Sequence, residues 1–199
     1  MSTRSMVDNV YVTGDEPLQL RLVSAGVDLL EEEGLGGLTL RAITRRTGVS
    51  HGAPRRYFAT HNALLAAIAA SGLSDLAAGI RPVLGAVDVQ AEERLIRLGL
   101  EYVQFAERRP AMFELMFRHD LLDGAGANLR ETTLPLFDSL VRLVAEASPA
   151  CEDPKASAIG VWTNLHGIAV LTANRSLELV GAPHDLTTVV AQVVRRHLS

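Results

Sequence analysis

The stretch LTLRAITRRTGVSHGAPRRYFATHNALL, residues 38–65, decides how the N-terminal third of the chain folds. Thr39 is a good helix N-cap, and apolar residues and arginines follow it at helical spacing, so a short amphipathic helix is expected there. Gly48 permits a sharp turn, and Ser50 is expected to cap a second short helix over residues 51–57. Two short helices joined by such a turn have helix-turn-helix form.

The residues around the turn favour this motif over a generic helical hairpin. Thr44 is small and lies four residues before Gly48, where the two helices approach most closely. Pro54 fixes the local backbone and removes one hydrogen bond, so the second helix is expected to be short and stiff. In a helix-turn-helix the second helix enters the DNA major groove. The apolar residues expected beneath the two helices are Leu40, Val49 and Phe58.

The charge of this segment differs from the charge of the whole chain. The 199 residues include 19 Lys and Arg against 23 Asp and Glu, which gives a formal net charge of −4. Residues 39–61 contain five arginines and two histidines and no acidic residue. A basic patch on an acidic body can bind the phosphate backbone while the body is kept off the duplex. A solvated basic helix face is the alternative interpretation.

Residues 38–65 resemble the DNA-binding signature of TetR/AcrR-type transcriptional regulators, T-x-x-x-I-A-x-x-x-G-V-S-x-G-x-x-Y-x-x-F-x-x-K-x-x-L. Three positions depart from the signature, because Thr44 replaces the usual Ala, Arg55 the usual Tyr and His61 the usual Lys. A mostly neutral histidine weakens the phosphate contact expected at that position. The resemblance implies a three-helix DNA-binding head, a homodimer on a palindromic operator of double-stranded DNA, and repression relieved by a small molecule.

The expected DNA contacts fall into two groups. Arg41, Arg55 and Arg56 are expected nearest the bases or groove walls, because Arg pairs bidentately with guanine. Arg55 stands where the family commonly places a Tyr that touches phosphate, so a backbone contact is its alternative role. For Tyr57 the alternative is packing beside Phe58. The expected phosphate contacts are Thr39, Arg45, Ser50, Tyr57 and His61, and His51 and Gly52 complete the expected DNA-binding set.

Helical periodicity continues along the chain, so the expected fold class is all-α. Apolar residues recur at helical spacing from Pro17, and Gly34 is placed to end that first helix. We expect a flexible arm over residues 1–16, a helix-turn-helix DNA-binding domain over 17–61, and a helical effector-binding and dimerisation domain over 62–199. Within the last of these, amphipathic helices are expected around residues 62–80, 91–108, 110–117 and 134–144.

Residues 156–177 differ from the other helical segments because apolar residues occur around most of the helix circumference. A helix of this kind needs partners on more than one side. In TetR-like proteins the last two long helices pair with their twins in a four-helix bundle, and residues 156–177 and 186–198 fit that place by order and spacing. The resemblance therefore implies a two-fold dimer there. The alternative is a central core helix of a monomer.

Trp162, His166 and Gly167 resemble the W-x-x-x-H-G motif of one TetR C-terminal domain type. Trp162 and His166 share a helix face, so the pair could stack on and hydrogen-bond to a small, largely apolar effector. By family analogy, the effector favours a dimer whose recognition helices no longer match successive major grooves. The alternative is core packing around a satisfied structural histidine. The other expected ligand-binding residues are Tyr102, Phe105, Met112, Phe113, Met116 and Phe137.

Several functional classes lack their sequence signatures. The N-terminus has no apolar signal-peptide core, and charge, Gly or Pro interrupts every long apolar stretch, so a cytoplasmic protein without a membrane span is expected. The single cysteine, Cys151, cannot form an internal disulfide, and no zinc ligand set is present. No HExxH, P-loop or nucleophile-elbow motif occurs, and the neighbouring His119 and Asp120 do not face each other on a helix. Neither an enzyme nor a cofactor is expected; an all-helical enzyme or interaction module is the alternative class.

Overall fold

The computed structural model describes residues 17–126, 128–182 and 185–198, and the arm expected over residues 1–16 lies outside them. The described residues form ten α-helices and one 3₁₀ helix, with no β-strand among them. The expected all-α fold class is therefore confirmed. In chain order the helices are α1 (Leu18–Gly37), α2 (Leu40–Thr47), η1 (Ala53–Arg56), α3 (His61–Gly85), α4 (Ala91–Arg108), α5 (Pro110–Met116), α6 (His119–Leu122), α7 (Arg130–Ala147), α8 (Pro154–Ala173), α9 (Ser176–Leu179) and α10 (Thr187–Arg196).

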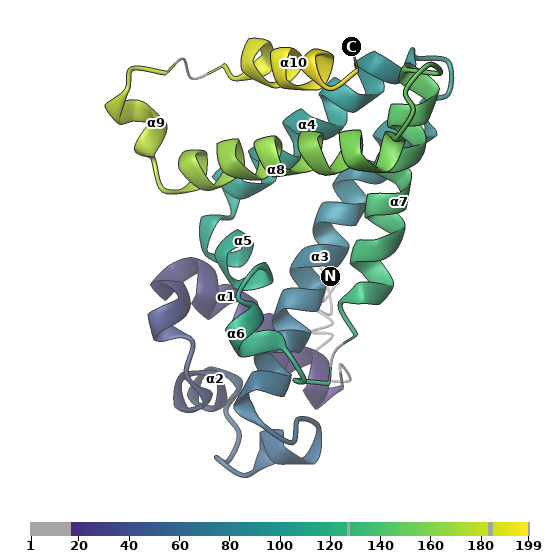
Figure 1. Cartoon of the computed structure of the whole chain (residues 1–199). Helices are drawn as coiled ribbons and strands as arrows, with labels where there is room; N and C mark the ends of the chain where they lie inside the picture. The colour runs from purple at the N-terminus through teal and green to yellow at the C-terminus, as the bar shows by residue number, and fades with distance from the viewer. Residues whose placement is uncertain (1–16, 127, 183–184, 199) are drawn as a thin grey trace, which may run out of the picture.

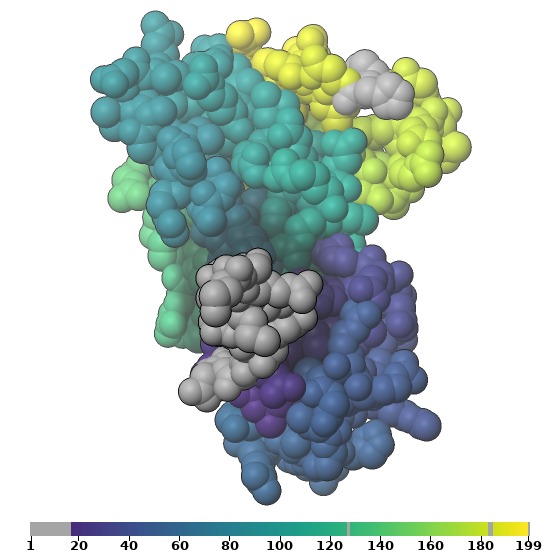
Figure 2. Space-filling model, turned by 180° about the vertical axis from the view of Figure 1, so that it is seen from behind, coloured from purple at the N-terminus to yellow at the C-terminus, as the bar shows by residue number. Residues whose placement is uncertain are grey.

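The helices form two parts that one long helix connects. Figure 1 shows the head, α1, α2 and η1, at one end and α8 and α10 at the other, with α3 running from the head into the body, α4–α10. The same division is visible from behind in Figure 2, where the purple and blue head lies below the teal and yellow body. In the body α4 is central, because it contacts α3, α5, α7, α8 and α10.

A glycine interrupts the first helix at the position where the sequence predicts its end. α1 buries Leu22, Leu29 and Leu30 and packs against α2, α3 and α5. Gly34 has φ 70° and ψ −174°, a conformation that residues with a side chain rarely adopt, and it interrupts the helix. One further turn follows the interruption and ends at Gly37.

The helix α3 belongs to the cores of both parts. Its N-terminus is capped by Thr60, whose hydroxyl oxygen accepts a hydrogen bond from the Ala63 N–H at 3.0 Å. It contacts α1 in the head and α4, α5, α6 and α7 in the body, and it carries buried residues along most of its length. Gly72 permits the contact with α5, because an added Cβ would stand only 2.4 Å from the Met112 sulfur.

The helix expected over residues 156–177 is shorter than predicted. α8 ends at Ala173, and Arg175 then adopts a left-handed conformation with φ 60°, which breaks the helix before α9 begins. The side-chain oxygen of Asn174 accepts a hydrogen bond from the Ser176 N–H at 3.0 Å, an Asx turn that stabilises the break. Asn is a common turn residue for this reason, so the break had a signal in the sequence.

Two helices are long and apolar enough to span a membrane by length and composition alone, α3 and α8. Core helices of folded soluble proteins pass the same test, so the expectation that no segment spans a membrane stays a prediction. Half of the most apolar window of α3 is buried among the other helices, as in a core helix of a folded protein. In α8 only 22 % of the corresponding window is buried, so this helix keeps a broad apolar surface.

The junction between α3 and α4 contains a buried arginine. Arg94 is 6 % exposed, and its guanidinium donates hydrogen bonds to the carbonyls of Val83 (3.4 Å) and Leu84 (2.7 Å). Both carbonyls belong to the last turn of α3. The Val83 carbonyl also accepts a hydrogen bond from the Ala86 N–H at 3.4 Å, whereas the Leu84 carbonyl, at the end of the helix, has Arg94 as its donor. The exposed carboxylate of Glu146 on α7 balances the buried charge, with both oxygens 3.2 Å from the guanidinium.

We expect Arg94→Met to lower the free energy of unfolding by about 1–3 kcal/mol, because the Leu84 carbonyl at the end of α3 loses its donor while the Val83 carbonyl keeps only the Ala86 N–H. The same change at Arg97, an exposed residue of α4 paired with Glu93, should cost at most about 0.5 kcal/mol. Chemical denaturation followed by circular dichroism measures both variants. Equal losses would contradict the role assigned to Arg94.

Candidate DNA-binding surface and ligand pocket

The turn after α2 has the geometry that the sequence predicts. The hydroxyl oxygen of Thr39 accepts a hydrogen bond from the Ala42 N–H at 3.2 Å, which starts α2. Gly48 ends α2 in the left-handed conformation, with φ 69° and ψ 29°. The Val49 N–H then donates to the carbonyl of Thr44 at 3.1 Å, so the chain turns back toward the buried side of α2.

Thr44 links α2 to the segment that follows the turn. Its side chain is 1 % exposed, and its hydroxyl donates to the Arg41 carbonyl at 3.1 Å. The same hydroxyl lies 3.3 Å from Nδ1 of His51. This hydroxyl is absent from the Ala of the family signature, so Thr44 gives His51 a partner within the head. His51, an expected DNA-binding residue, is exposed but has one ring nitrogen directed at this hydroxyl.

The segment after the turn is the four-residue 3₁₀ helix η1, and the longer helix expected over residues 51–57 is wrong. In an α-helix capped at Ser50, the N–H of residue 54 would bond to the Ser50 carbonyl. Pro54 has no N–H, so the Ala53 N–H bonds to that carbonyl at 3.0 Å and closes a 3₁₀ turn. η1 has no side-chain cap, so the expected Ser50 cap is also wrong.

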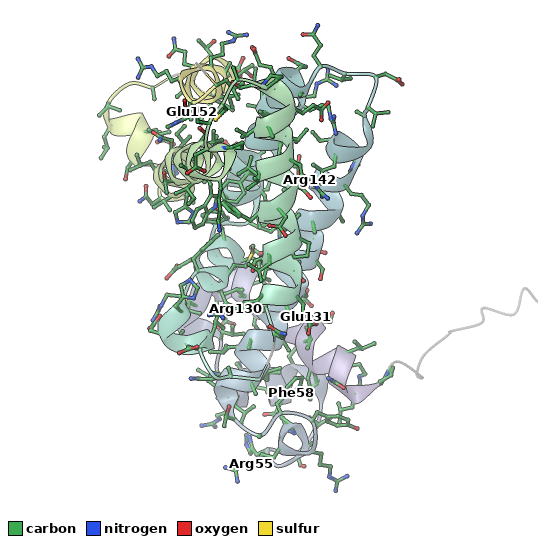
Figure 3. The ribbon with its side chains drawn as sticks, turned by 45° about the vertical axis from the view of Figure 1, so that its right-hand side comes forward. Arg55, Phe58, Arg130, Glu131, Arg142 and Glu152 are labelled. Atoms are coloured by element: carbon green, nitrogen blue, oxygen red, sulfur yellow. The ribbon has the colours of Figure 1, made fainter. Side chains whose placement is uncertain are left out.

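Most of the expected DNA-binding residues are exposed at the end of the head. Figure 3 shows Arg55 projecting from that end, and Phe58, which is 7 % exposed, packs into the core. Arg46, by contrast, forms an ion pair with Glu32 of α1. Within the part of the chain that the structure describes, no ion pair involves Arg41, Arg45, Arg55 or Arg56. The exposed members of the set are Thr39, Arg41, Arg45, Ser50, His51, Gly52, Arg55, Arg56 and Tyr57.

His61 is the member of the expected set that is not fully exposed. It lines a small cavity of about 170 Å³ together with Pro54, Phe58 and Leu64. Its Nδ1 is buried and has no hydrogen-bond partner among the described residues. A phosphate contact from His61 would therefore have to use the other ring nitrogen, Nε2.

We expect Gly48→Ala to lower the free energy of unfolding by about 1–2 kcal/mol, because a residue with a Cβ is strained at φ 69°. Gly52→Ala is the matched control, since Gly52 has φ −85° and open space around an added Cβ. That change should be neutral or slightly stabilising. Thermal or chemical denaturation compares the two variants, and equal stabilities would show that the left-handed turn is not required.

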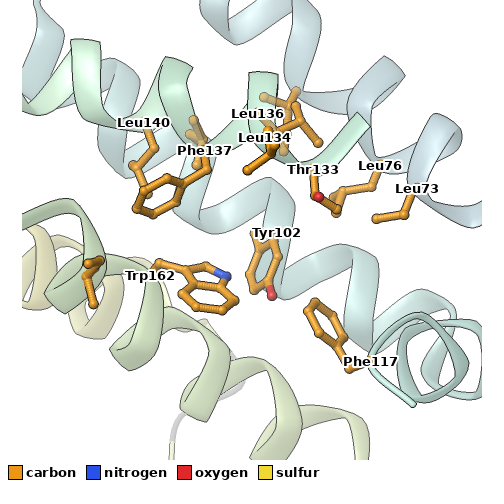
Figure 4. A pocket seen from close by; sticks show the side chains of 13 residues that line it. Leu73, Leu76, Tyr102, Phe117, Thr133, Leu134, Leu136, Phe137, Leu140 and Trp162 are labelled. Carbon is orange, nitrogen blue, oxygen red and sulfur yellow. The ribbon is translucent and has the colours of Figure 1, made fainter. Parts of the chain in front are cut away.

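A cavity of about 310 Å³ lies in the body between α3, α4, α7 and α8 (Figure 4). Figure 4 shows Phe137 and Leu134 of α7 across the cavity from Trp162 of α8 and Tyr102 of α4. The volume is at the lower end of the range for small-molecule sites, about 300–1,000 Å³. The lining residues are Leu73, Leu76, Ile80, Leu98, Tyr102, Phe117, Thr133, Leu134, Leu136, Phe137, Leu140, Ile159 and Trp162.

Some of the expected ligand-binding residues line this cavity and others do not. Those that line it are Tyr102, Phe137 and Trp162. Phe105, Met112, Phe113 and Met116 are instead buried in the core, and His166 contacts the Tyr102 hydroxyl from outside the wall. Helical spacing identifies an apolar face but not whether a cavity or another helix covers it. For the same reason, the wall residues from α3, and those from α7 other than Phe137, were not predicted from the sequence.

Tyr102 and His166 form a polar pair at the edge of the cavity. The Tyr102 hydroxyl lies 2.9 Å from Nδ1 of His166. The His166 ring belongs to an aromatic cluster, with ring centroids 4.5 Å from Phe117, 5.5 Å from Phe113 and 5.9 Å from Trp162. Burial raises the pKa of Tyr102 and lowers the pKa of His166. Both side chains are therefore mainly neutral near pH 7.

Two other kinds of site among the described residues would be a metal site and an acid–base pair of His119 with Asp120. No group of three or more His, Cys, Asp or Glu side chains among them could hold a metal ion. The carboxylate of Asp120 accepts hydrogen bonds from Arg118 at 2.8 and 2.7 Å, and this contact lowers the pKa of Asp120. Asp120 is thus engaged by Arg118 and does not orient the neighbouring His119.

Solved structures similar to this one include the following three. A protein of unknown function from Rhodococcus sp. RHA1 is 31 % identical, with a TM-score of 0.78 and 96 % of this chain and 97 % of that chain covered. A TetR-like transcriptional regulator from Rhodococcus sp. RHA1 is 15 % identical, with a TM-score of 0.71 and coverage of 94 % and 98 %. BioQ, solved with its natural double-stranded DNA operator, is 19 % identical, with a TM-score of 0.62 and coverage of 92 % and 100 %. The last two show similarity of fold.

Family profiles match both the N-terminal and the C-terminal part of the chain. No curated protein matches it. Residues 22–68 match the profile of the bacterial regulatory proteins of the tetR family, and these residues include most of α1, all of α2 and η1, and the start of α3. Residues 95–197 match the profile of a tetracyclin repressor-like C-terminal domain. The chain therefore belongs to the TetR family of bacterial regulators, and it is a non-enzymatic transcriptional regulator whose helix-turn-helix head is a DNA-binding domain.

Proposed function

We propose that this TetR-family regulator is a cytoplasmic, ligand-responsive repressor that binds a palindromic operator as a homodimer and is released by a small effector. The observation that carries the proposal is the group of exposed head arginines, Arg41, Arg45, Arg55 and Arg56, which have no acidic partner within the described chain. Unpaired guanidinium groups at the end of a helix-turn-helix are suited to phosphates and base edges.

Within the head, Arg41, Arg55 and Arg56 are assigned to base edges and groove walls. Arg45, Thr39, Ser50 and Tyr57 are assigned to phosphates, with His51 and Gly52 beside them and His61 as a weak contact. A 3₁₀ helix of four residues offers few positions for reading bases. Two heads in a symmetric dimer would read two half-sites about 34–36 Å apart, which supplies the missing specificity. BioQ, which shares the fold, was solved with its DNA operator.

We assign the dimer interface to α8 and α10. Val170 and Leu171 of α8 are 40 % and 42 % exposed, and nothing lies within 4 Å of a Cβ added to Gly167. This face of α8 is therefore apolar and open. Contiguous exposed apolar surface of this kind commonly marks a protein interface, and a two-fold axis lets one face cover its own copy. α10 packs on α4 and α8, which places it beside that face.

The pocket is connected to the head through α5. Phe117, at the C-terminal end of α5, lines the pocket. Arg109, at its N-terminal end, forms ion pairs with Glu31 of α1 (2.9 Å) and Asp75 of α3 (2.6 Å). An effector that displaces Phe117 would move α5 and, with it, the head. The shifted dimer no longer presents its two heads to successive major grooves, and the DNA is released.

DNA binding is tested by selecting bound sequences from a random duplex pool and titrating the enriched duplex at two salt concentrations. We expect a two-fold symmetric site whose affinity falls steeply as salt rises, because each phosphate contact releases counter-ions. Arg55→Ala should lower the affinity by about 1–3 kcal/mol. Arg46→Ala is the control, because Glu32 already binds that side chain, and its affinity should stay within about twofold of the wild type.

Two results would contradict these assignments. The absence of any enriched sequence, together with no binding at low salt, would exclude the proposed function. Wild-type affinity and sequence preference in Arg55→Ala would exclude Arg55 alone from the DNA contacts.

We expect Leu171→Glu to convert the dimer to a monomer and to abolish operator binding, because a buried, unpaired carboxylate costs several kcal/mol at each copy of the interface. Leu20→Glu is the control, since Leu20 is 52 % exposed on α1, far from α8. Analytical ultracentrifugation gives the mass of both variants. A dimer that persists in Leu171→Glu would place the interface on another surface.

A further inference from the structure

The wall of the body pocket restricts the chemistry of its ligand. Of the thirteen lining residues, ten have no polar side-chain atom, and none is Asp, Glu, Lys, Arg or His. The polar side-chain groups in the wall are the hydroxyls of Tyr102 and Thr133 and the indole N–H of Trp162. A charged group placed beside the buried Tyr102 would lose its hydration without meeting a counter-ion, and that loss exceeds what apolar contacts of a small molecule supply.

The Tyr102 hydroxyl is the polar group best placed to fix a ligand. Tyr102 is 7 % exposed, and Figure 4 shows its oxygen between the rings of Trp162 and Phe117. Nδ1 of His166 lies 2.9 Å from this oxygen. When the neutral imidazole carries its proton on Nδ1, it donates to the tyrosine oxygen and leaves the tyrosine O–H available to a third group. Thr133 lies on the exposed start of α7, where water competes for its hydroxyl.

We propose that the effector is an uncharged, mainly apolar molecule whose one polar group is a carbonyl or hydroxyl oxygen that accepts a hydrogen bond from Tyr102. His166 is a positioning residue in this arrangement, because it holds the Tyr102 hydroxyl and does not line the pocket. Carboxylates, ammonium ions and phosphate esters of the same size are excluded. This inference rests on the proposed ligand-responsive function and specifies its effector by chemical class.

Binding can be measured directly, because Trp162 is the single tryptophan of the chain and lies in the pocket wall. The full chain is titrated at pH 7 with 2-octanone, 1-octanol, octanoate and octylammonium, which share one chain length and differ in the polar group. Quenching of the tryptophan fluorescence gives each affinity. We expect the ketone and the alcohol to bind at least about tenfold more tightly than the two ions.

Three variants test the residues. Tyr102→Phe should weaken binding of 2-octanone about two- to tenfold, the effect of one net hydrogen bond. Thr133→Val, which removes the other hydroxyl of the wall, should change it less than about twofold. His166→Phe keeps an aromatic ring in the cluster and should weaken binding in the same direction as Tyr102→Phe. In the double variant His166→Phe should add nothing further, because a positioning residue acts only through the group it holds.

The outcomes separate this inference from the proposed function. Octanoate or octylammonium binding as tightly as 2-octanone would overturn the inference, and so would a loss of ketone binding in Thr133→Val but not in Tyr102→Phe. An absence of quenching by all four compounds in a protein that still binds its selected duplex would overturn the inference and leave DNA binding intact. Binding of the neutral compounds by a protein that binds no duplex would support the pocket chemistry and exclude the repressor function.

Discussion

The structure depends on one constraint: the single helix α3 must pack into the core of the head and into the core of the body at the same time. Its first turns pack against α1, and its later turns carry Leu73, Leu76 and Ile80 to the wall of the body pocket. Thr60 fixes where the helix begins, and Arg94 satisfies the carbonyls at its end. The head by itself is too short a segment to bury a large core, so its orientation is defined by the helix that it shares with the body. Any change in how α3 packs in the body is therefore a change in where the head points.

The pocket is a second consequence of that sharing. The body leaves a cavity of about 310 Å³ where α3, α4, α7 and α8 meet, and its wall is almost wholly apolar. The cavity is open to solvent, because Leu134, Ile159 and Trp162 of its wall are 56 %, 45 % and 39 % exposed. A ligand that fits the cavity removes this apolar surface from water, and that burial is a source of binding free energy. The Tyr102 and His166 pair then limits which molecules fit with their polar group satisfied.

Helix caps and turns could be predicted from the sequence, whereas the way in which separate helices face one another could not. Thr39, Gly34 and Gly48 act through their own backbone neighbours, so their capping and turn roles were correctly predicted. The 3₁₀ form of η1 follows from Pro54 standing four residues after Ser50, a local rule that the prediction of a helix over residues 51–57 did not apply in full. The ion pair of Arg46 with Glu32, and the placement of Met112 in the core while Tyr102 reaches the pocket, depend on how separate helices rotate against each other. Helical periodicity contains no information about that rotation.

The joint between head and body is made of contacts that can rearrange. Arg109 bonds to Glu31 and Asp75 on two different helices, and these carboxylates are partly or largely exposed. Ion pairs of this kind contribute about 0–1 kcal/mol each, so they define the position of α5 more than they stabilise the fold. The other end of α5 is held by aromatic rings, where Phe117 lies against His166 and borders the pocket. A population shift needs two arrangements that differ by only a few kcal/mol, which a single small ligand can supply. Weak ion pairs at one end of α5 and a ligand-facing ring at the other satisfy that requirement, whereas a rigid apolar junction would not.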